Sequence, residues 1–240
     1  MRDIEDRHWW FQGRRRIVAK LLELMPLVDD SRILDLGCGT GGNLQMLAGF
    51  GEVTGVEMDE QALALAKERG DAPVMAGSLP DDVPFEPASF HCVTMLDVLE
   101  HVEQDQAGLA AVYRLILPGG HLLLTVPAFR FLWGPHDEEH HHYRRYRAEE
   151  LRSRLLGAGF EVTHLSYFNT WLFPLIALVR LLHKWIPAGK AGMETGLPPA
   201  WLNRLLLGLF SSERLIVTRG RLPFGVSLLA VARKPSASKT

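Results

Sequence analysis

The chain has 240 residues, of which 47% are hydrophobic and 22% are charged, and its formal net charge at pH 7 is −2. This length suits a single α/β domain with an added segment and is enough to bury a large core. A charge near zero argues against a nucleic acid partner, because general binding to phosphates requires a strongly basic face. Two cysteines, Cys38 and Cys92, are too few for a disulfide framework.

The first ten residues, MRDIEDRHWW, are charged and lack the apolar core of a secretory signal. No segment reaches the roughly 20 uninterrupted apolar residues that span a bilayer. We therefore expect a cytoplasmic protein. The apolar segments described below are also compatible with a peripheral position at the inner face of a membrane.

From about residue 31, short β-rich runs alternate with helical stretches, a pattern that predicts a Rossmann-like, doubly wound α/β sheet. A helix at about 11–25 precedes it, within an N-terminal lid over 1–28. The predicted strands are 32–37, 53–58, 72–77, 90–97, 121–127, 161–168 and 224–234, and the predicted helices between them begin near residue 43 or cover 60–70, 106–116 and 149–160. The turn Pro118-Gly119-Gly120 is expected to close the helix at 106–116.

A glycine-rich turn follows the first predicted strand. Residues 33–43 read ILDLGCGTGGN, and a pattern D-x-G-x-G-x-G begins at Asp35. Glycines are needed where a chain turns sharply and a cofactor lies against bare backbone. The pattern G-x-G-x-x-G at Gly37, Gly39 and Gly42 is weak by itself, and it also fits a tight turn without a ligand.

Two further features favour a cofactor site. Glu57 ends the second strand, twenty residues after Gly37, where a carboxylate can accept hydrogen bonds from both hydroxyls of a ribose. The sequence LPGGHLLLTVP at 117–127 marks the turn into the fifth strand. Together with the glycine-rich turn, these residues resemble the class I S-adenosylmethionine-dependent methyltransferases over about residues 31–165.

The resemblance implies a seven-stranded sheet whose last strand, within 222–234, is antiparallel. The core then covers 31–168, and 169–217 is a helical insertion before the last strand of a single domain, 1–240. In that family the glycine-rich loop holds the methionine part of the cofactor, the acid holds the ribose, and neighbouring residues flank the adenine. The implied cofactor-binding residues are Asp35, Gly37, Cys38, Gly39, Gly41, Asn43, Glu57, Met58, Ser78, Leu79, Asp97 and Val98. Family members often carry an aspartate where this chain has Ser78.

The stretch MLDVLEHV, residues 95–102, falls where the fourth strand meets its helix. Glu100 and His101 fit three roles: residues that bond to backbone at a helix start, a general base at His101, or ligands of a divalent metal together with Asp97. Histidine suits proton transfer near neutral pH. The metal alternative rests on similarity to the E-x-x-E-H of small-RNA 2′-O-methyltransferases and ubiquinone-pathway O-methyltransferases. Magnesium, manganese and zinc all remain open for such a ligand set.

The stretch HDEEHHHYRRYR, residues 136–147, follows the fifth strand and is predicted as a loop up to His142. Ligands of open α/β sheets bind at the carboxyl ends of the strands, so this stretch is expected to form a wall of the acceptor pocket. A solvated charged loop is the alternative. His136 and His142 are candidate bases. The predicted acceptor-binding residues are Tyr143, Arg144 and Arg145, with the arginines bonding an anionic group, and Trp10 and Arg14 of the lid.

The insertion contains two strongly apolar helical segments, 169–185 and 198–217. A stripe of this width must be covered by something. Core packing, a homodimer interface, a pocket for a lipophilic acceptor and contact with a membrane surface all remain open.

The sequence therefore predicts methyl transfer from S-adenosylmethionine to an oxygen or nitrogen of a small, lipophilic or anionic acceptor, which is a free or lipid-linked molecule. A cofactor-binding scaffold or sensor without catalysis is the alternative from another class. A nucleic acid methyltransferase is disfavoured by the charge.

Overall fold

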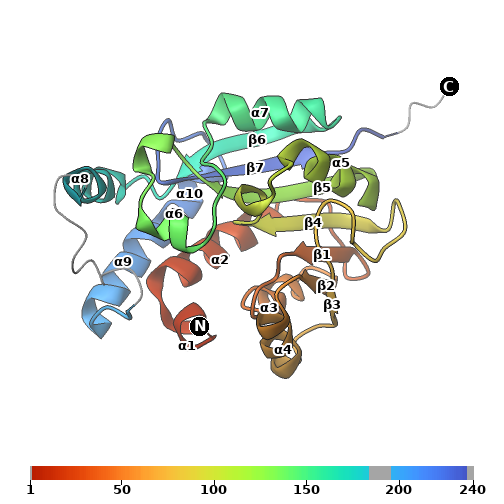
Figure 1. Cartoon of the computed structure of the whole chain (residues 1–240), viewed down its shortest axis with the longest axis horizontal. Helices are drawn as coiled ribbons and strands as arrows, with labels where there is room; N and C mark the ends of the chain where they lie inside the picture. Colours follow the sequence, from red (N-terminus) through yellow and green to blue (C-terminus); the bar gives the residue numbers. More distant parts are fainter. Residues whose placement is uncertain (1, 184–195, 237–240) are drawn as a thin grey trace.

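A computed structural model describes residues 2–183 and 196–236. Its centre is a seven-stranded sheet in the order β3-β2-β1-β4-β5-β7-β6 (Figure 1). The strands are β1 Arg32–Leu36, β2 Glu52–Glu57, β3 Val74–Ala76, β4 Phe90–Leu96, β5 Ile116–Pro127, β6 Glu161–Phe168 and β7 Ser227–Arg233. The predicted Rossmann-like fold class is confirmed by this strand order.

The last strand runs antiparallel, as predicted. Strand β7 lies between β5 and β6, with Leu124 opposite Ala230 on one side and Leu165 opposite Ala230 on the other. The neighbouring pairs β1–β2, β1–β4, β2–β3 and β4–β5 are all parallel. The carboxyl ends of β1, β2, β4 and β5 therefore meet at one edge, where this class of sheet binds ligands.

Helices cover both faces of the sheet. On one face α5 (Asp105–Leu115) and α7 (Ala148–Gly157) bury Leu109, Val112, Leu151 and Leu155 against the strands. On the other face, α2 (Trp9–Leu22), α3 (Leu44–Leu47) and α4 (Glu60–Arg69) form a second core, which also contains side chains from the insertion. In α2 the buried residues Ile17, Val18, Leu21 and Leu22 recur at helical spacing, which explains why this helix docks by one face.

Three predicted boundaries were wrong. Helix α2 begins at Trp9 rather than near residue 11, because the His8 side chain caps it by accepting a hydrogen bond from the Trp10 amide, and a further helix α1 (Arg2–Arg7) precedes it. The turn at 118–120 does not close a helix. Helix α5 ends at Leu115, and the turn lies inside β5, where the register against β4 shifts and Gly119 takes φ +85°.

The third correction concerns the segment 136–142, which is not entirely a loop. A short helix α6 spans Pro135–Glu139. Proline at the first helical position has a suitable φ and lacks the amide that would go unpaired there. The Gly134 amide donates to Asp137 Oδ2 at 2.9 Å, so an acid three residues into the helix satisfies its start.

The insertion forms α8 (Phe173–His183), α9 (Ala200–Ser212) and α10 (Arg214–Val217), while residues 184–185 of the first predicted segment lie outside the described residues. Helices α8 and α9 lie at the same end of the molecule as α1 and α6 (Figure 1). Within the described residues, no helix is both long and apolar enough to cross a bilayer.

Helix α9 packs closely on the lid helix α2. The rings of Trp9 and Phe210 meet edge to face with centroids 5.7 Å apart, and the Trp9 amide donates to Asn203 Oδ1 at 2.9 Å. A Cβ at Gly13 would lie only 2.3 Å from Phe210 Cδ1, so this position requires glycine. One side of the insertion is thus core, as one of the predicted alternatives required.

Glu213 fastens the two ends of the insertion together. Its carboxylate is buried and accepts hydrogen bonds from the amides of Asn169, Thr170 and Trp171 at 2.6, 2.7 and 2.9 Å. Burial raises the pKa of Glu213, and these three amide donors partly offset the rise. The residue follows α9 and meets the segment that leaves β6, so it closes the insertion at its base.

Replacing Glu213 with alanine should lower the free energy of unfolding by about 2–4 kcal/mol, because three amides lose their acceptor in a buried place. Urea unfolding followed by circular dichroism measures this loss. Glu213→Gln retains one acceptor oxygen and should lose less. A loss below about 0.5 kcal/mol, the range of ordinary surface changes, would contradict this structural role of Glu213.

Candidate active site

The glycine-rich loop turns sharply after β1. Gly37, Gly39 and Gly41 have φ values of +66°, +58° and +85°, a region that side-chain-bearing residues rarely adopt. The amides of Gly37 and Cys38 both donate to the Val56 carbonyl, at 2.8 and 3.0 Å, which ties the loop to the end of β2. A Cβ at Gly37 would lie 2.6 Å from Val98 Cγ2, so the loop also presses against the residue after β4.

Glu57 lies at the carboxyl end of β2 and joins that end to the loop. Its Oε2 accepts a hydrogen bond from the Gly39 amide at 2.8 Å, and its Oε1 accepts from the amides of Met58 and Asp59 at 2.9 Å. Three backbone donors hold the carboxylate in one orientation beside the glycine-rich loop. This is the place where the sequence predicts a ribose-binding acid.

The lid helix carries a cation to the centre of the sheet edge. Arg14 is buried and forms an ion pair with Asp97 at the end of β4, and it also donates to the Leu96 carbonyl at 3.4 Å. The Trp10 ring lies 4.6 Å from the Arg14 guanidinium carbon and covers it. Trp10 and Arg14 were predicted to contact the acceptor, whereas the structure places Arg14 on a protein carboxylate at the cofactor side.

Asp35 is fully buried at the end of β1, where its Oδ1 accepts a hydrogen bond from Thr94 at 2.6 Å. Burial raises its pKa to about 6, while the Thr94 hydroxyl and the charge of Arg14 act in the opposite direction. Its other oxygen, Oδ2, has no hydrogen-bond partner in the described part of the chain, and neither has the buried Oδ1 of Asn43. Unpaired buried polar atoms of this kind are costly unless a ligand completes them.

The remaining predicted cofactor residues differ in exposure. Met58 is 73% exposed, so its side chain is free to cover an adenine ring. Ser78 forms paired backbone hydrogen bonds with Asp82, which make a tight turn, and Leu79 packs partly on the core beside α5. Cys38 is buried, and burial raises the pKa of its thiol well above the usual range.

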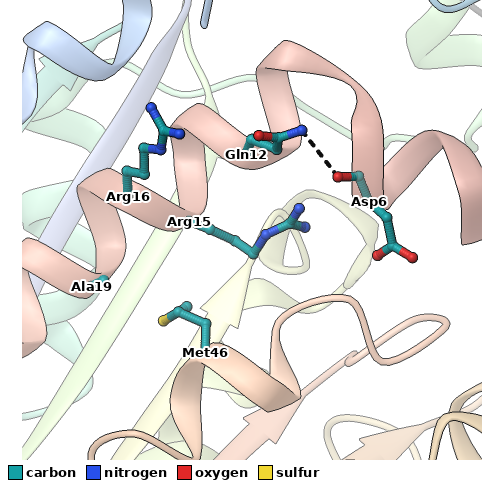
Figure 2. A pocket seen from close by; sticks show the side chains of 6 residues that line it. All are labelled: Asp6, Gln12, Arg15, Arg16, Ala19 and Met46. Atoms are coloured by element: carbon teal, nitrogen blue, oxygen red, sulfur yellow. Dashed lines mark hydrogen bonds between the residues drawn. The ribbon is translucent and has the colours of Figure 1, made fainter. Parts of the chain in front are cut away.

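The two N-terminal helices close over the glycine-rich loop from outside. Glu5 of α1 accepts a hydrogen bond from the Thr40 hydroxyl at 2.5 Å, and Arg15 of α2 donates to the carbonyls of Gly42 and Glu5. Figure 2 shows Arg15 pointing between α1 and Met46 of α3, in a hollow of about 360 Å³. The hollow lies between the lid helices and α3, and none of the predicted cofactor residues lines it.

Two histidines and one acid gather beyond the ends of β4 and β5. A ring nitrogen of His101, a ring nitrogen of His142 and a carboxylate oxygen of Glu100 all lie within 4.8 Å of one another. The two rings meet edge to face with centroids 4.6 Å apart. His101 follows β4 and His142 follows α6, so the fold brings together two of the three predicted base candidates.

The electrostatics of this cluster favour neutral groups. Partial burial, followed by the nearby His142, lowers the pKa of His101 to about 4. Burial, followed by the neighbouring Asp97, raises the pKa of Glu100 well above its usual range, and the Glu100 Oε2 has no hydrogen-bond partner in the described part of the chain. Glu100, His101 and His142 have the donor types of a divalent metal site. Asp97, predicted as the third ligand, pairs with Arg14 instead.

Asp137, which forms a hydrogen bond with His142, was not predicted from the sequence. Asp137 is fully buried and bonds to the His142 ring at Nδ1, 2.8 Å, and to Arg145 through two nitrogens at 2.8 and 2.9 Å. Arg180 of α8 lies 3.6 Å from its Oδ2. A Gly-Pro-x-Asp pattern before the histidines was the available signal, since it predicts a helix start whose acid turns inward.

Both predicted anion-binding arginines have protein partners. Arg145 is buried on Asp137, and Arg144 lies 3.0 Å from Asp105 Oδ2 and donates to the Glu103 carbonyl. The geometry therefore corrects the expectation that this pair is open to an anionic acceptor. Tyr143 is exposed, and its amide donates to the Glu100 carbonyl at 2.8 Å. The His136 ring packs against His140 at a tilt of 59°, with centroids 4.3 Å apart, and is set back from the cluster, 6.1 Å from the His142 ring.

The chain is similar to known methyltransferases. The sequence profile of a methyltransferase domain family matches residues 9–165. The chain is 30% identical over 151 residues to a malonyl-[acyl-carrier protein] O-methyltransferase of Enterobacter lignolyticus, covering 60% of each chain. It is 35% identical over 136 residues to a ubiquinone biosynthesis O-methyltransferase of Pseudomonas aeruginosa, covering 49% of this chain and 56% of that one.

A solved phosphoethanolamine N-methyltransferase 2 of Haemonchus contortus, in complex with S-adenosyl-L-methionine, superposes with a TM-score of 0.62 at 19% identity, over 98% of this chain and 60% of that one. At this identity the likeness shows the fold alone. The chain belongs to the methyltransferase domain family, and the predicted resemblance to class I S-adenosylmethionine-dependent methyltransferases is confirmed. It matches a little over half of the length of these curated relatives.

Glu57→Ala should weaken binding of S-adenosylmethionine by about tenfold or more, since hydrogen bonds to a charged group contribute about 1.5–3 kcal/mol. Isothermal titration calorimetry measures the change. Glu60→Ala, which removes an exposed acid at the start of α4, is the matched control and should bind as the unmodified protein does. Unchanged affinity in Glu57→Ala would refute the assigned role.

Proposed function

We propose that this chain transfers a methyl group from S-adenosylmethionine to an oxygen or nitrogen of a small lipophilic acceptor. The observation that carries the proposal is the Glu57 carboxylate fixed on the Gly39 amide, at the carboxyl ends of β1 and β2, in a chain of the methyltransferase domain family. The buried, unpaired oxygens of Asp35 and Asn43 fit a polar ligand at that loop. The bound cofactor supplies an already reactive methyl group, so the protein's task is alignment and exclusion of water.

The chain's own residues divide this task. Glu57 and the glycine-rich loop bind the cofactor, and Asp97 is held by Arg14 at the junction between cofactor and acceptor. The histidine cluster lies next to this junction and takes the proton that an acceptor hydroxyl or amine releases. His142 is the stronger base candidate, because the lowered pKa of His101 leaves that ring a poor proton acceptor.

An aromatic cluster favours a lipophilic acceptor over an anionic one. Phe129 stacks on Tyr167 with centroids 4.9 Å apart, and Phe173 reaches both Phe131 and Phe224. Phe129 and Phe131 follow β5, Tyr167 lies at the end of β6, Phe173 begins α8 and Phe224 precedes β7. Since Arg144 and Arg145 are neutralised by protein acids, this region offers apolar surface rather than unpaired positive charge.

Transfer should be seen as incorporation of a radiolabelled methyl group from S-adenosylmethionine into solvent-extracted lipids. His142→Ala should lower the rate by roughly 10² or more, the usual contribution of a positioned base. His91→Ala, at the opposite end of β4, is the matched control. Tight cofactor binding without transfer to any acceptor would instead support the scaffold alternative.

We further propose that the insertion presents this site to an anionic membrane surface. Residues 169–217 carry five Lys and Arg and two Glu, a formal charge of +3, whereas the rest carries 21 Lys and Arg and 26 Asp and Glu, a charge of −5. On α9, Trp201 and Leu205 are 69% and 61% exposed and form one stripe with Leu209. Of the two acids, Glu213 is buried, and Glu194 lies outside the described residues.

A stripe of this kind, flanked by Arg204, has the composition of a helix that lies in the headgroup region. Leu175 and Leu178 of α8 are also exposed, as is Trp171 just before this helix. This placement accounts for a lipophilic acceptor, which would be taken up from the bilayer by the adjoining aromatic cluster. The protein would then be peripheral to the membrane.

The double variant Trp201→Ser/Leu205→Ser should lose co-sedimentation with vesicles of phosphatidylcholine and phosphatidylglycerol by at least about tenfold, because it removes most of the exposed apolar stripe. Added salt should weaken binding of the unmodified protein. Leu24→Ser/Val28→Ser, two exposed apolar residues outside the insertion, is the control. Absent vesicle binding, with dimerisation that the Trp201/Leu205 variant abolishes in ultracentrifugation, would make the stripe a homodimer interface.

A further inference from the structure

Asp137 stands apart from the other acids of its segment. Its neighbours Glu138 and Glu139 are exposed, whereas Asp137, in the same short helix α6, is fully buried. Four groups surround its two oxygens: the Gly134 amide, two nitrogens of Arg145 and the His142 ring. A buried carboxylate with this many donors is fully satisfied.

The charge state of Asp137 follows from these partners. Burial by itself would raise the pKa of this carboxyl, but the hydrogen bonds from His142 and Arg145 and the charge of Arg145 hold it well below its usual range. An ionised carboxylate accepts hydrogen bonds and donates none. The contact at 2.8 Å therefore requires the proton on His142 Nδ1, and the neutral ring keeps its lone pair on Nε2.

Nε2 of His142 is the ring nitrogen that remains available to accept a proton. One nitrogen of His142 belongs to the cluster with Glu100 and His101, and Nδ1 is already engaged by Asp137. We propose that Asp137 is a positioning residue that fixes the tautomer and orientation of His142, so that Nε2 accepts the acceptor's proton. This inference rests on the proposed methyl transfer, and it adds the residue that makes His142 a directed base.

Arg145 gives Asp137 its own orientation. The guanidinium bonds both carboxylate oxygens, Nε to Oδ1 and a terminal nitrogen to Oδ2, and it also donates to the Ala128 carbonyl at 3.2 Å. This two-point contact fixes the rotation of the Asp137 carboxylate. Arg145 was predicted to bind an acceptor but thus has a different role. It orients Asp137, which in turn orients His142.

The variant Asp137→Asn has a predictable effect on the ring. If the amide nitrogen replaced Oδ2, it would face two donors, the Gly134 amide and Arg145. If it replaces Oδ1, it faces one donor, Arg145 Nε, and can donate to His142 Nδ1. The second arrangement has fewer conflicts, so the variant should move the ring proton to Nε2 and abolish the acceptor atom.

The first test reads the tautomer directly. Long-range ¹⁵N–¹H correlation spectra of protein labelled in histidine, taken at alkaline pH and assigned with His142→Gln, should show His142 of the unmodified protein protonated at Nδ1. Asp137→Asn should show it protonated at Nε2. A ring protonated at Nε2 in the unmodified protein would overturn the inference, whether or not an acceptor is known.

Asp105→Asn is the matched control. Asp105 is also buried and also pairs with an arginine, Arg144, but it accepts its hydrogen bond from the Tyr146 hydroxyl and not from a histidine. It should lose comparable stability and leave the His142 tautomer unchanged. A change of tautomer in both variants would mean that general loosening, and not the Asp137 contact, controls the ring.

The second test separates this role from the proposed function. With the lipid fraction that the unmodified protein methylates, supplied in its unmethylated form as acceptor, Asp137→Asn should lower kcat by about 10- to 100-fold with KM changed less than about threefold, as expected when proton transfer and not binding is impaired. Unchanged kcat together with a shifted tautomer would refute the positioning role while leaving methyl transfer intact. Absence of transfer by the unmodified protein would refute the proposed function and leave the tautomer measurement valid.

Discussion

The structure depends on the interaction of one buried arginine, Arg14, with the acidic residues at the carboxyl edge of the sheet. Asp35 lies near the end of β1 and Asp97 and Glu100 follow β4, so the parallel arrangement brings all three acids toward Arg14. Arg14 pairs with Asp97, and its charge partly offsets the rise in pKa that burial causes at Asp35 and Glu100. Removing a buried counter-charge leaves an uncompensated acid at a cost of roughly 3–5 kcal/mol. The sheet edge therefore requires the lid helix that carries Arg14.

The lid in turn depends on the insertion. Helix α2 is held from outside by α9, through the contact of Phe210 with Gly13 and Trp9, and Glu213 closes the base of the insertion on the end of β6. Helix α8 reaches the acceptor side through Arg180, which donates to the Leu132 carbonyl and approaches Asp137. The segment between β6 and β7 thus contacts both the lid over the cofactor loop and the acid behind His142.

Sequence patterns predicted the parts of this molecule whose chemistry is local. The glycine-rich turn and the alternation of strands and helices follow from short motifs and their spacing, because backbone sterics fix what a run of glycines or alternating apolar residues can do. The antiparallel last strand, in contrast, was implied by the resemblance to the methyltransferase family. Partners of charged side chains were not predictable in this way. Arg144 meets Asp105 and Arg14 meets Asp97, contacts between residues 39 and 83 positions apart that no local pattern encodes. Asp137 was missed for a related reason, since the Gly-Pro-x-Asp pattern marks a helix start but does not encode the contacts of Asp137 with His142 and Arg145.

These contacts would couple the proposed membrane-binding surface mechanically to the candidate active site. Helix α9 buries Phe210 against the lid and exposes Trp201 and Leu205 on its other side, so a surface that engages the exposed stripe also bears on the helix that carries Arg14. Since α9 and α2 interlock at Gly13, where no side chain fits, a displacement of one helix is passed to the other with little slack. On the proposed function, the lipid surface that supplies the acceptor would then also press the lid closed over the cofactor loop, and closure would coincide with delivery of the substrate.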